Sequence, residues 1–205
     1  MATAAKRYFS STRIAVLALF SALAAVLYIF NFAIPFAFPG FLEFKFSDVP
    51  VLIGTFALGP LSGCIIVVMM VLIKLVCVST RTMFVGDFAD IIIGIAFCLP
   101  AGLIYKKHRT FKGAAAGLAV GSAVSIAVAV LFNWLVLVPF YVEWMFGGSW
   151  DPLLGMMTPL FPSCTRENFY QFYLWVSVLP FNALRCLAAS LITILVYKHV
   201  SRAIN

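Results

Sequence analysis

The chain has few charged residues and almost no histidine. Of its 205 residues, 10% are charged, 64% are hydrophobic and two are histidines. Soluble globular proteins carry roughly 25% charged and about 45–50% apolar residues. This composition excludes a soluble enzyme, a secreted disulfide-rich scaffold and a disordered chain. We therefore predict an integral membrane protein.

Motifs of several enzyme classes are also absent. No G-x-x-x-x-G-K-[ST] loop and no H-E-x-x-H sequence occurs, which excludes P-loop ATP hydrolysis and zincin chemistry. His108 and His199 lie beside basic residues, without an acid or nucleophile nearby. The five cysteines form no C-x-x-C pair and are interpreted as small apolar membrane residues. We predict that the chain is not an enzyme and holds no metal or cofactor.

Long uncharged stretches predict an all-α membrane protein with six transmembrane helices in a single domain over residues 1–205. Ile14–Asn31 contains 18 residues without a charge, enough for one span. Gly59-Pro60 interrupts the apolar run after Asp48, because this pair breaks a helix. The predicted helices cover about 14–31, 49–58, 61–78, 87–105, 113–140 and 169–197.

Basic residues predict the orientation of these helices. The N-terminal segment, the 106–112 loop and the C-terminal segment hold nine of the fourteen lysines and arginines and no acidic residue. The positive-inside rule therefore places both termini in the cytoplasm. A cleaved signal peptide ending near Ala22-Leu23-Ala24 is the alternative for the N-terminus, although its apolar run is longer than a usual signal core.

Polar residues of four predicted helices fall at one depth. At about 1.5 Å rise per residue, they lie roughly 20–30 Å from the cytoplasmic ends of their helices. They are Lys74, Asp87, Asp90, Asn133, Asn182 and Arg185. Ionisable groups inside a bilayer are candidates for function, so we predict a polar chamber that opens outward and binds a ligand. The alternative is a set of ion pairs, such as Asp90 with Arg185 or Lys74, that only holds helices together.

The chamber balances two cations against two carboxylates and adds two amides, which suits a mostly neutral ligand. Two segments, 31–48 and 143–167, are rich in aromatic residues and are predicted to cover it, although the tryptophans of the second segment also fit an aromatic belt at the membrane interface. Within the first, a partly alternating stretch predicts a short strand with Leu42 and Phe44 on one side and Glu43 and Lys45 on the other.

Two stripes of small residues indicate close helix packing. The first helix carries Ala15, Ala18, Ala22 and Ala25 on one face, and the fifth carries Gly113, Gly117, Gly121 and Ser125 at intervals of four. We expect the glycine stripe to pack within the chain. The alanine stripe fits either internal packing or docking of a partner subunit.

Several motifs occur in a characteristic order between about residues 13 and 200. They are Phe44-Lys45-Phe46-Ser47-Asp48-Val49-Pro50 with Gly54 and Gly59-Pro60, Gly86-Asp87-Phe88-Ala89-Asp90, Tyr105-Lys106-Lys107, Asn133 before Leu137-Val138-Pro139, and Pro180-Phe181-Asn182-Ala183-Leu184-Arg185. Together they resemble the substrate-binding (S) subunits of energy-coupling-factor (ECF) vitamin transporters, particularly the riboflavin-specific ones.

The resemblance implies a six-helix, multi-pass subunit of the bacterial plasma membrane that binds a vitamin with high affinity. It also implies docking on a transmembrane coupling subunit and two ATPase subunits, with the alanine face of the first helix as the docking surface. In riboflavin members, polar residues at the positions of Asp87, Asn133, Asn182 and Arg185 hold the flavin. This sequence departs from the family's usual Glu at position 87 and Lys at position 185.

Our hypothesis is therefore a riboflavin-binding subunit. Leu42 and Phe44 pack on the flavin ring, Asn133 and Asn182 hydrogen-bond its edges, and Lys74, Asp87 and Arg185 tune the pocket. The same fold binding folate, pantothenate or thiamine is the second hypothesis. A stand-alone ion or proton carrier or channel, or a structural membrane adaptor, would belong to a different class.

Overall fold

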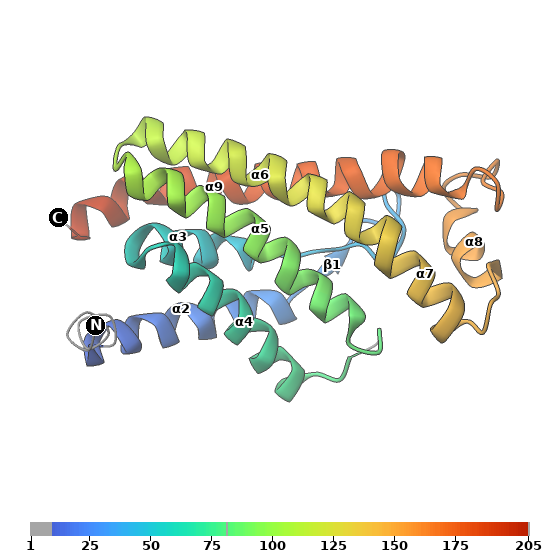
Figure 1. Cartoon of the computed structure of the whole chain (residues 1–205), viewed down its shortest axis with the longest axis horizontal. Helices are drawn as coiled ribbons and strands as arrows, with labels where there is room; N and C mark the ends of the chain where they lie inside the picture. Colours follow the sequence, from blue (N-terminus) through green and yellow to red (C-terminus); the bar gives the residue numbers. More distant parts are fainter. Residues whose placement is uncertain (1–9, 81, 205) are drawn as a thin grey trace.

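The computed structural model describes residues 10–80 and 82–204, with side chains described up to residue 196. The chain forms an elongated bundle of helices that run along one long axis (Figure 1). The separate helices are α2 (Ser11–Ile29), α3 (Asp48–Leu58), α4 (Pro60–Cys77), α5 (Val85–Lys107) and α8 (Asp151–Met157). One continuous helix over Phe111–Met145 contains α6 (Phe111–Phe132), η1 (Asn133–Leu137), α7 (Val138–Phe140) and η2 (Tyr141–Met145). The last helix of the bundle begins with η3 (Gln171–Val178) and continues as α9 (Leu179–Ile204).

Five of the described helices are long and apolar enough to span a membrane. They begin and end near the predicted ranges, but the helix predicted over about 113–140 extends to Met145. The predicted second helix is α3, which has 11 residues and is about 16 Å long, too short to cross a bilayer alone. The described part of the chain is therefore a multi-pass helical bundle with one short inner helix.

The break between α3 and α4 follows from Gly59-Pro60. Gly59 adopts a φ of 99°, a backbone conformation that L side chains rarely adopt, and Pro60 occupies the first turn of α4. Proline is favoured at this position because the first amide of a helix has no partner within the helix. The two residues reverse the chain without a loop, so α3 packs directly against α4.

The glycine stripe packs within the chain, as predicted. A methyl group added at Gly117 would lie 2.6 Å from the carbonyl oxygen of Ala101, and one at Gly121 would lie 2.5 Å from that of Phe97. Ser125 continues the stripe and donates a hydrogen bond to the carbonyl of Ile93 at 3.1 Å. These small residues let α6 approach the backbone of α5 closely.

Two π-helical stretches, η1 and η3, each lie just before a proline. Pro139 and Pro180 have no amide hydrogen and clash with the carbonyl four residues earlier, which lies in η1 or η3. The helix therefore continues with wider hydrogen-bonded turns instead of regular α-helical ones. Each stretch adds a residue to the turn and changes which side chains face the bundle interior.

Residues 30–47 connect α2 to α3 through a small antiparallel hairpin. Its strands, β1 (Phe32–Ala33) and β2 (Glu43–Phe44), pair Phe32 with Phe44. The strand predicted within residues 41–46 is therefore confirmed for Glu43 and Phe44. Phe44 is buried against Phe38 and Phe181, which attaches this segment to the start of α9.

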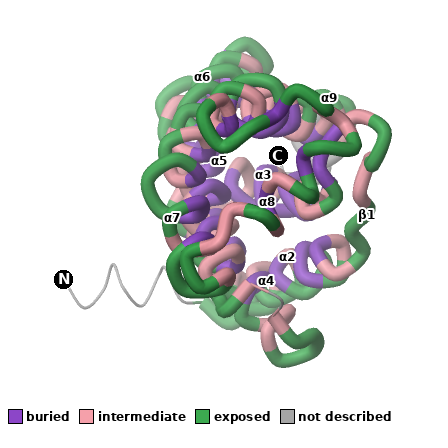
Figure 2. The backbone as a smooth tube through the Cα atoms, turned by 90° about the vertical axis from the view of Figure 1, so that its right-hand side faces the viewer, coloured by how far each residue is buried: buried purple, intermediate pink, exposed green. Residues whose placement is uncertain are grey.

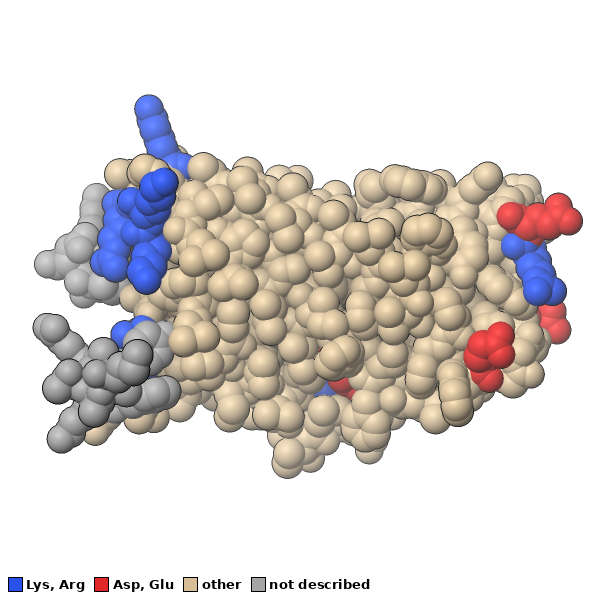
Figure 3. All heavy atoms as spheres, viewed as in Figure 1, with Lys and Arg blue, Asp and Glu red and all other residues tan. Residues whose placement is uncertain are grey.

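Buried residues face the centre of the bundle and exposed residues face outward (Figure 2). Many of the exposed side chains are apolar, including Leu19, Val76 and Leu195. Charged residues gather at the two ends of the molecule. In Figure 3, basic side chains lie at one end and acidic side chains predominate at the other, and the wide band between them shows only one small spot of charged atoms.

Candidate ligand-binding site

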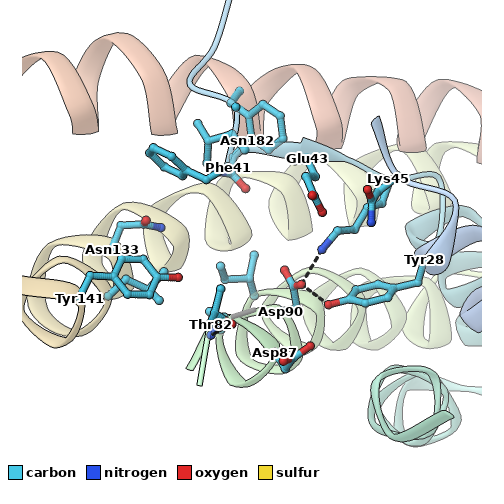
Figure 4. A pocket seen from close by; sticks show the side chains of 18 of the residues that line it. Tyr28, Phe41, Glu43, Lys45, Thr82, Asp87, Asp90, Asn133, Tyr141 and Asn182 are labelled. Atoms are coloured by element: carbon cyan, nitrogen blue, oxygen red, sulfur yellow. Dashed lines mark hydrogen bonds and ion pairs between the residues drawn. The ribbon is translucent and has the colours of Figure 1, made fainter. Parts of the chain in front are cut away.

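A cavity of about 720 Å³ lies toward the end of the bundle opposite the α5–α6 turn. Its volume falls in the usual range for small-molecule sites. The end of α2, the start of α5, η1, η2 and the start of α9 surround it, and the 30–47 segment forms one wall. Figure 4 shows side chains from these elements pointing into one space. Elements far apart in the sequence therefore build a single chamber.

Lys74 and Asp87 form the first of three ion pairs at the cavity. Lys74 Nζ lies 2.6 Å from Asp87 Oδ1, and the side chains are 15% and 5% exposed. The Thr80 hydroxyl donates to the other carboxylate oxygen at 2.7 Å. Asp87 also lies in the first turn of α5, where the helix dipole stabilises a negative charge. One full positive charge, one hydroxyl donor and the helix dipole thus hold this carboxylate.

Lys45 and Asp90 form the second ion pair, with 2.7 Å between Lys45 Nζ and Asp90 Oδ2. The Tyr28 hydroxyl donates to the same carboxylate oxygen, and Lys45 Nζ lies 4.1 Å from the centre of the Tyr28 ring. The dashed lines in Figure 4 mark both polar contacts. The pair attaches the 30–47 segment to α2 and α5.

Arg185 and Asp48 form the third ion pair, with Arg185 Nε 3.3 Å from Asp48 Oδ2. A second guanidinium nitrogen of Arg185 donates to Ser125 Oγ at 3.3 Å. The pair joins α9 to the first turn of α3. Because burying a lone charge costs several kcal/mol, all three pairs are best understood as charges that neutralise one another around the cavity.

Two asparagines and a tyrosine supply neutral polar groups. The Asn133 amide donates to the Ala129 carbonyl at 2.8 Å, and its oxygen accepts a 2.5 Å hydrogen bond from the Tyr173 hydroxyl. The Asn182 amide donates to the Val178 carbonyl at 2.9 Å. Its oxygen has no hydrogen-bond donor among the described residues. Asn182 therefore retains an acceptor that a ligand in the cavity can use.

The remaining wall is apolar and aromatic. The residues that contribute such surface include Phe41, Leu42, Leu137, Tyr141, Phe146, Leu153 and Phe181. Phe41 packs against Tyr173, with ring centres 5.7 Å apart. A chamber with aromatic walls and a few fixed polar groups is typical of sites for flat organic ligands.

Six of the seven predicted ligand-binding residues line the cavity: Leu42, Lys74, Asp87, Asn133, Asn182 and Arg185. The seventh, Phe44, points away from it and packs against Phe181, with ring centres 6.2 Å apart. The suggested pairing of Asp90 with Arg185 or Lys74 is wrong, because Asp90 pairs with Lys45. The structure therefore brings these six residues to one cavity, but the contacts among the charged groups differ from those suggested.

Sequence reasoning missed several lining residues, notably Tyr28, Phe41, Glu43, Lys45 and Tyr173. Alternation had separated Glu43 and Lys45 from Phe44, yet it could not show which side faces the chamber. Tyr173 had no distinguishing signal, since tyrosine is common near membrane interfaces. Within the described residues, no group of three His, Cys, Asp or Glu side chains is placed to hold a metal ion.

The predicted alanine face is mostly exposed. Ala15, Ala18 and Ala22 lie on the surface of α2, whereas Ala25 is buried in the core. The exposed part of this face thus ends before Ala25. It is flanked by exposed apolar residues such as Leu19 and Leu23.

The comparisons with known proteins agree with this architecture. Residues 12–197 match the family described as "ECF transporter, substrate-specific component". A Staphylococcus aureus protein named riboflavin transporter RibU is 31% identical over 189 residues, which cover 92% of this chain and 90% of the relative. The riboflavin transporter FmnP of Bacillus subtilis is 32% identical over 130 residues, or 63% of this chain and 68% of that protein.

A solved structure is also similar. It is described as the S component of a bacterial ECF transporter, shares 29% sequence identity and superimposes with a TM-score of 0.70. The match covers 95% of this chain and 98% of the solved one.

Proposed function

The chain belongs to the family of ECF transporter substrate-specific components, and we propose that it binds riboflavin for import across the bacterial plasma membrane. The observation that carries the proposal is the cavity of about 720 Å³, in which aromatic walls surround paired charges and a free amide acceptor. Riboflavin is flat, uncharged and rich in hydrogen-bonding groups, so it suits such a lining.

Within the site, the asparagines recognise the polar edges of the flavin. Asn182 offers its free oxygen, and Asn133 is held in place by the Tyr173 hydroxyl. Leu42 and Phe41 provide apolar surface for the ring. Lys74, Asp87 and Arg185 set the local field, while Phe44 supports the 30–47 segment from behind.

The proposal includes a topology and partners. The chain forms one domain over residues 1–205 with six membrane helices, counting the short α3 but not α8. Both termini, whose last residues lie outside the described part of the chain, are cytoplasmic together with the basic 106–112 loop. The gathering of basic side chains at one end of the bundle supports this orientation (Figure 3). The cavity then opens toward the outer side of the membrane.

Transport requires further subunits in this proposal. A transmembrane coupling subunit docks on the exposed alanines of α2 (Ala15, Ala18 and Ala22), where small side chains permit close helix contact. Two ATPase subunits hydrolyse ATP. The chain supplies ligand binding and no catalysis.

Fluorescence titration tests the binding step. Purified protein in detergent should quench riboflavin fluorescence until its binding site is saturated. An excess of folate, pantothenate or thiamine should not reverse the quenching. Asn182→Ala should weaken binding about tenfold, the effect of losing one buried hydrogen bond to a ligand. Gln171→Ala removes an exposed amide on η3 outside the cavity and should leave the affinity unchanged. Absence of quenching by the unaltered protein would refute riboflavin as the ligand.

Reconstitution separates the proposal from a stand-alone carrier or channel. Liposomes that contain the chain alone should bind riboflavin without accumulating it. Uptake by the chain alone, driven by an ion gradient, would favour the carrier. A chain that binds no vitamin at all would favour a structural adaptor.

A further inference from the structure

The charges around the cavity do not cancel completely. Each of the three cations that line it, Lys45, Lys74 and Arg185, forms an ion pair with a carboxylate. Glu43 also lines the cavity, but its carboxylate has no hydrogen bond or ion pair within the described residues. Arg185 pairs with Asp48, which does not itself line the cavity, so four carboxylates accompany three cations and Glu43 is the carboxylate without a cation partner.

The backbone fixes the direction of this carboxylate. Glu43 lies in β2 beside Phe44, and successive side chains of a strand point to opposite faces. Phe44 is buried against Phe181 behind the segment, so Glu43 faces the other way. Figure 4 shows the Glu43 side chain pointing from its strand into the cavity. If the strand turned over, Phe44 would leave its buried position and enter the chamber. The burial of Phe44 therefore keeps Glu43 on the side of the cavity.

We propose that Glu43 makes the site select neutral ligands over anionic ones, so that it accepts riboflavin and rejects flavins that carry a phosphate group. The inference rests on the proposed function, since it concerns the choice between two forms of the same ligand. A phosphate monoester carries about 1.5 to 2 negative charges at pH 7. No cation of the lining is free to compensate them, because each already has a carboxylate partner.

The expected discrimination follows from the size of the cavity. In a space of about 720 Å³, a bound phosphate lies within roughly 10 Å of the Glu43 carboxylate. At the effective dielectric constant of about 20 that describes such sites, repulsion across this distance weakens binding about tenfold or more. A neutral ligand is not affected by this repulsion and can instead donate a hydroxyl or ring N–H to the same oxygens.

Parallel titrations with riboflavin and riboflavin 5′-phosphate test the proposal in the purified protein. The measured quantity is the ratio of the two dissociation constants, which does not depend on the fraction of folded protein. The unaltered protein should bind the phosphate ester at least about tenfold more weakly, and Glu43→Gln should reduce that ratio about tenfold. Glu143→Gln removes an exposed carboxylate outside the cavity and should leave the ratio unchanged.

Salt provides a test that needs no variant. Screening by added salt should improve binding of the phosphate ester by the unaltered protein and leave riboflavin binding nearly constant. An unaltered protein that binds both flavins equally, or a ratio that Glu43→Gln does not change, would overturn the inference while the proposed function stands. A protein that binds neither flavin would refute the proposed function itself.

Discussion

The ion pair between Lys74 and Asp87 allows the sharpest test of how the charges around the cavity are maintained. Asp87→Asn removes the negative charge and keeps the size of the side chain and its ability to accept from Thr80. Lys74, which is 15% exposed, then remains beside the cavity without its partner. We expect this variant to be considerably less stable than the unaltered protein.

The magnitude follows from the burial of both groups. The charged atoms are 2.6 Å apart, and Asp87 is 5% exposed, so little water can replace the lost partner. Removing one member of such a buried pair costs about 3–5 kcal/mol of the free energy of unfolding. For a chain of this length, each kcal/mol lowers Tm by roughly 2–4 °C, which predicts a decrease of about 6–20 °C.

A double-mutant cycle separates the lone charge from the lost contact. Lys74→Met combined with Asp87→Asn removes both charges, and replacing both members of a buried pair is often nearly neutral. Tm in detergent, followed by tryptophan fluorescence, should therefore return to within a few degrees of the unaltered value. Glu143→Gln, an exposed acid without an ion-pair partner within the described residues, serves as the control. A double variant that is as unstable as the Asp87→Asn variant would show that the pair does not work by charge neutralisation.

Three further results are expected. Gly117→Ala should lower the free energy of unfolding by about 1–3 kcal/mol, because the added methyl group would lie 2.6 Å from a backbone oxygen of α5; Gly155→Ala, with nothing within 4 Å, should not. Tyr173→Phe should weaken riboflavin binding about tenfold in fluorescence titrations, because the Tyr173 hydroxyl that donates to Asn133 Oδ1 at 2.5 Å is lost and the Asn133 amide is no longer held in place. Tyr170→Phe, which lies outside the cavity, should leave the affinity unchanged. Ala22→Trp on the exposed face of α2 should leave riboflavin binding intact and abolish uptake in cells that express the whole transporter.

Much of the fold could be predicted because hydropathy and helix breakers act locally. Gly59-Pro60 separates α3 from α4 regardless of the surrounding structure. The π-helical stretches η1 and η3 could not be predicted in this way. Pro139 and Pro180 show where the α-helical ladder fails, but continuation with wider turns depends on the neighbours that pack around the helix.

For the site, the level of a residue along its helix could be predicted, but the partner that its side chain contacts could not. Helical rise depends on residue count alone, so it predicted that Lys74, Asp87 and Asn182 lie at one level, and all three line the same cavity. Ion-pair partners depend on the rotation of each helix and on how far a side chain reaches. Lys45 lies in the 30–47 segment, whose path has no helical period from which a depth could be calculated, so its contact with Asp90 could not be foreseen.

The orientation of β2 has a physical cause, and it explains why Phe44, predicted to contact the ligand, points away from the cavity. A buried aromatic side chain removes about 150–250 Å² from water, and Phe44 gains this burial permanently by packing against Phe181. Contact with a ligand would bury Phe44 only while the site is filled. The strand therefore turns Phe44 toward the protein and leaves Glu43 and Lys45 facing the cavity. A wall of this kind can be hydrated when the site is empty, so the chamber does not need its ligand to remain folded.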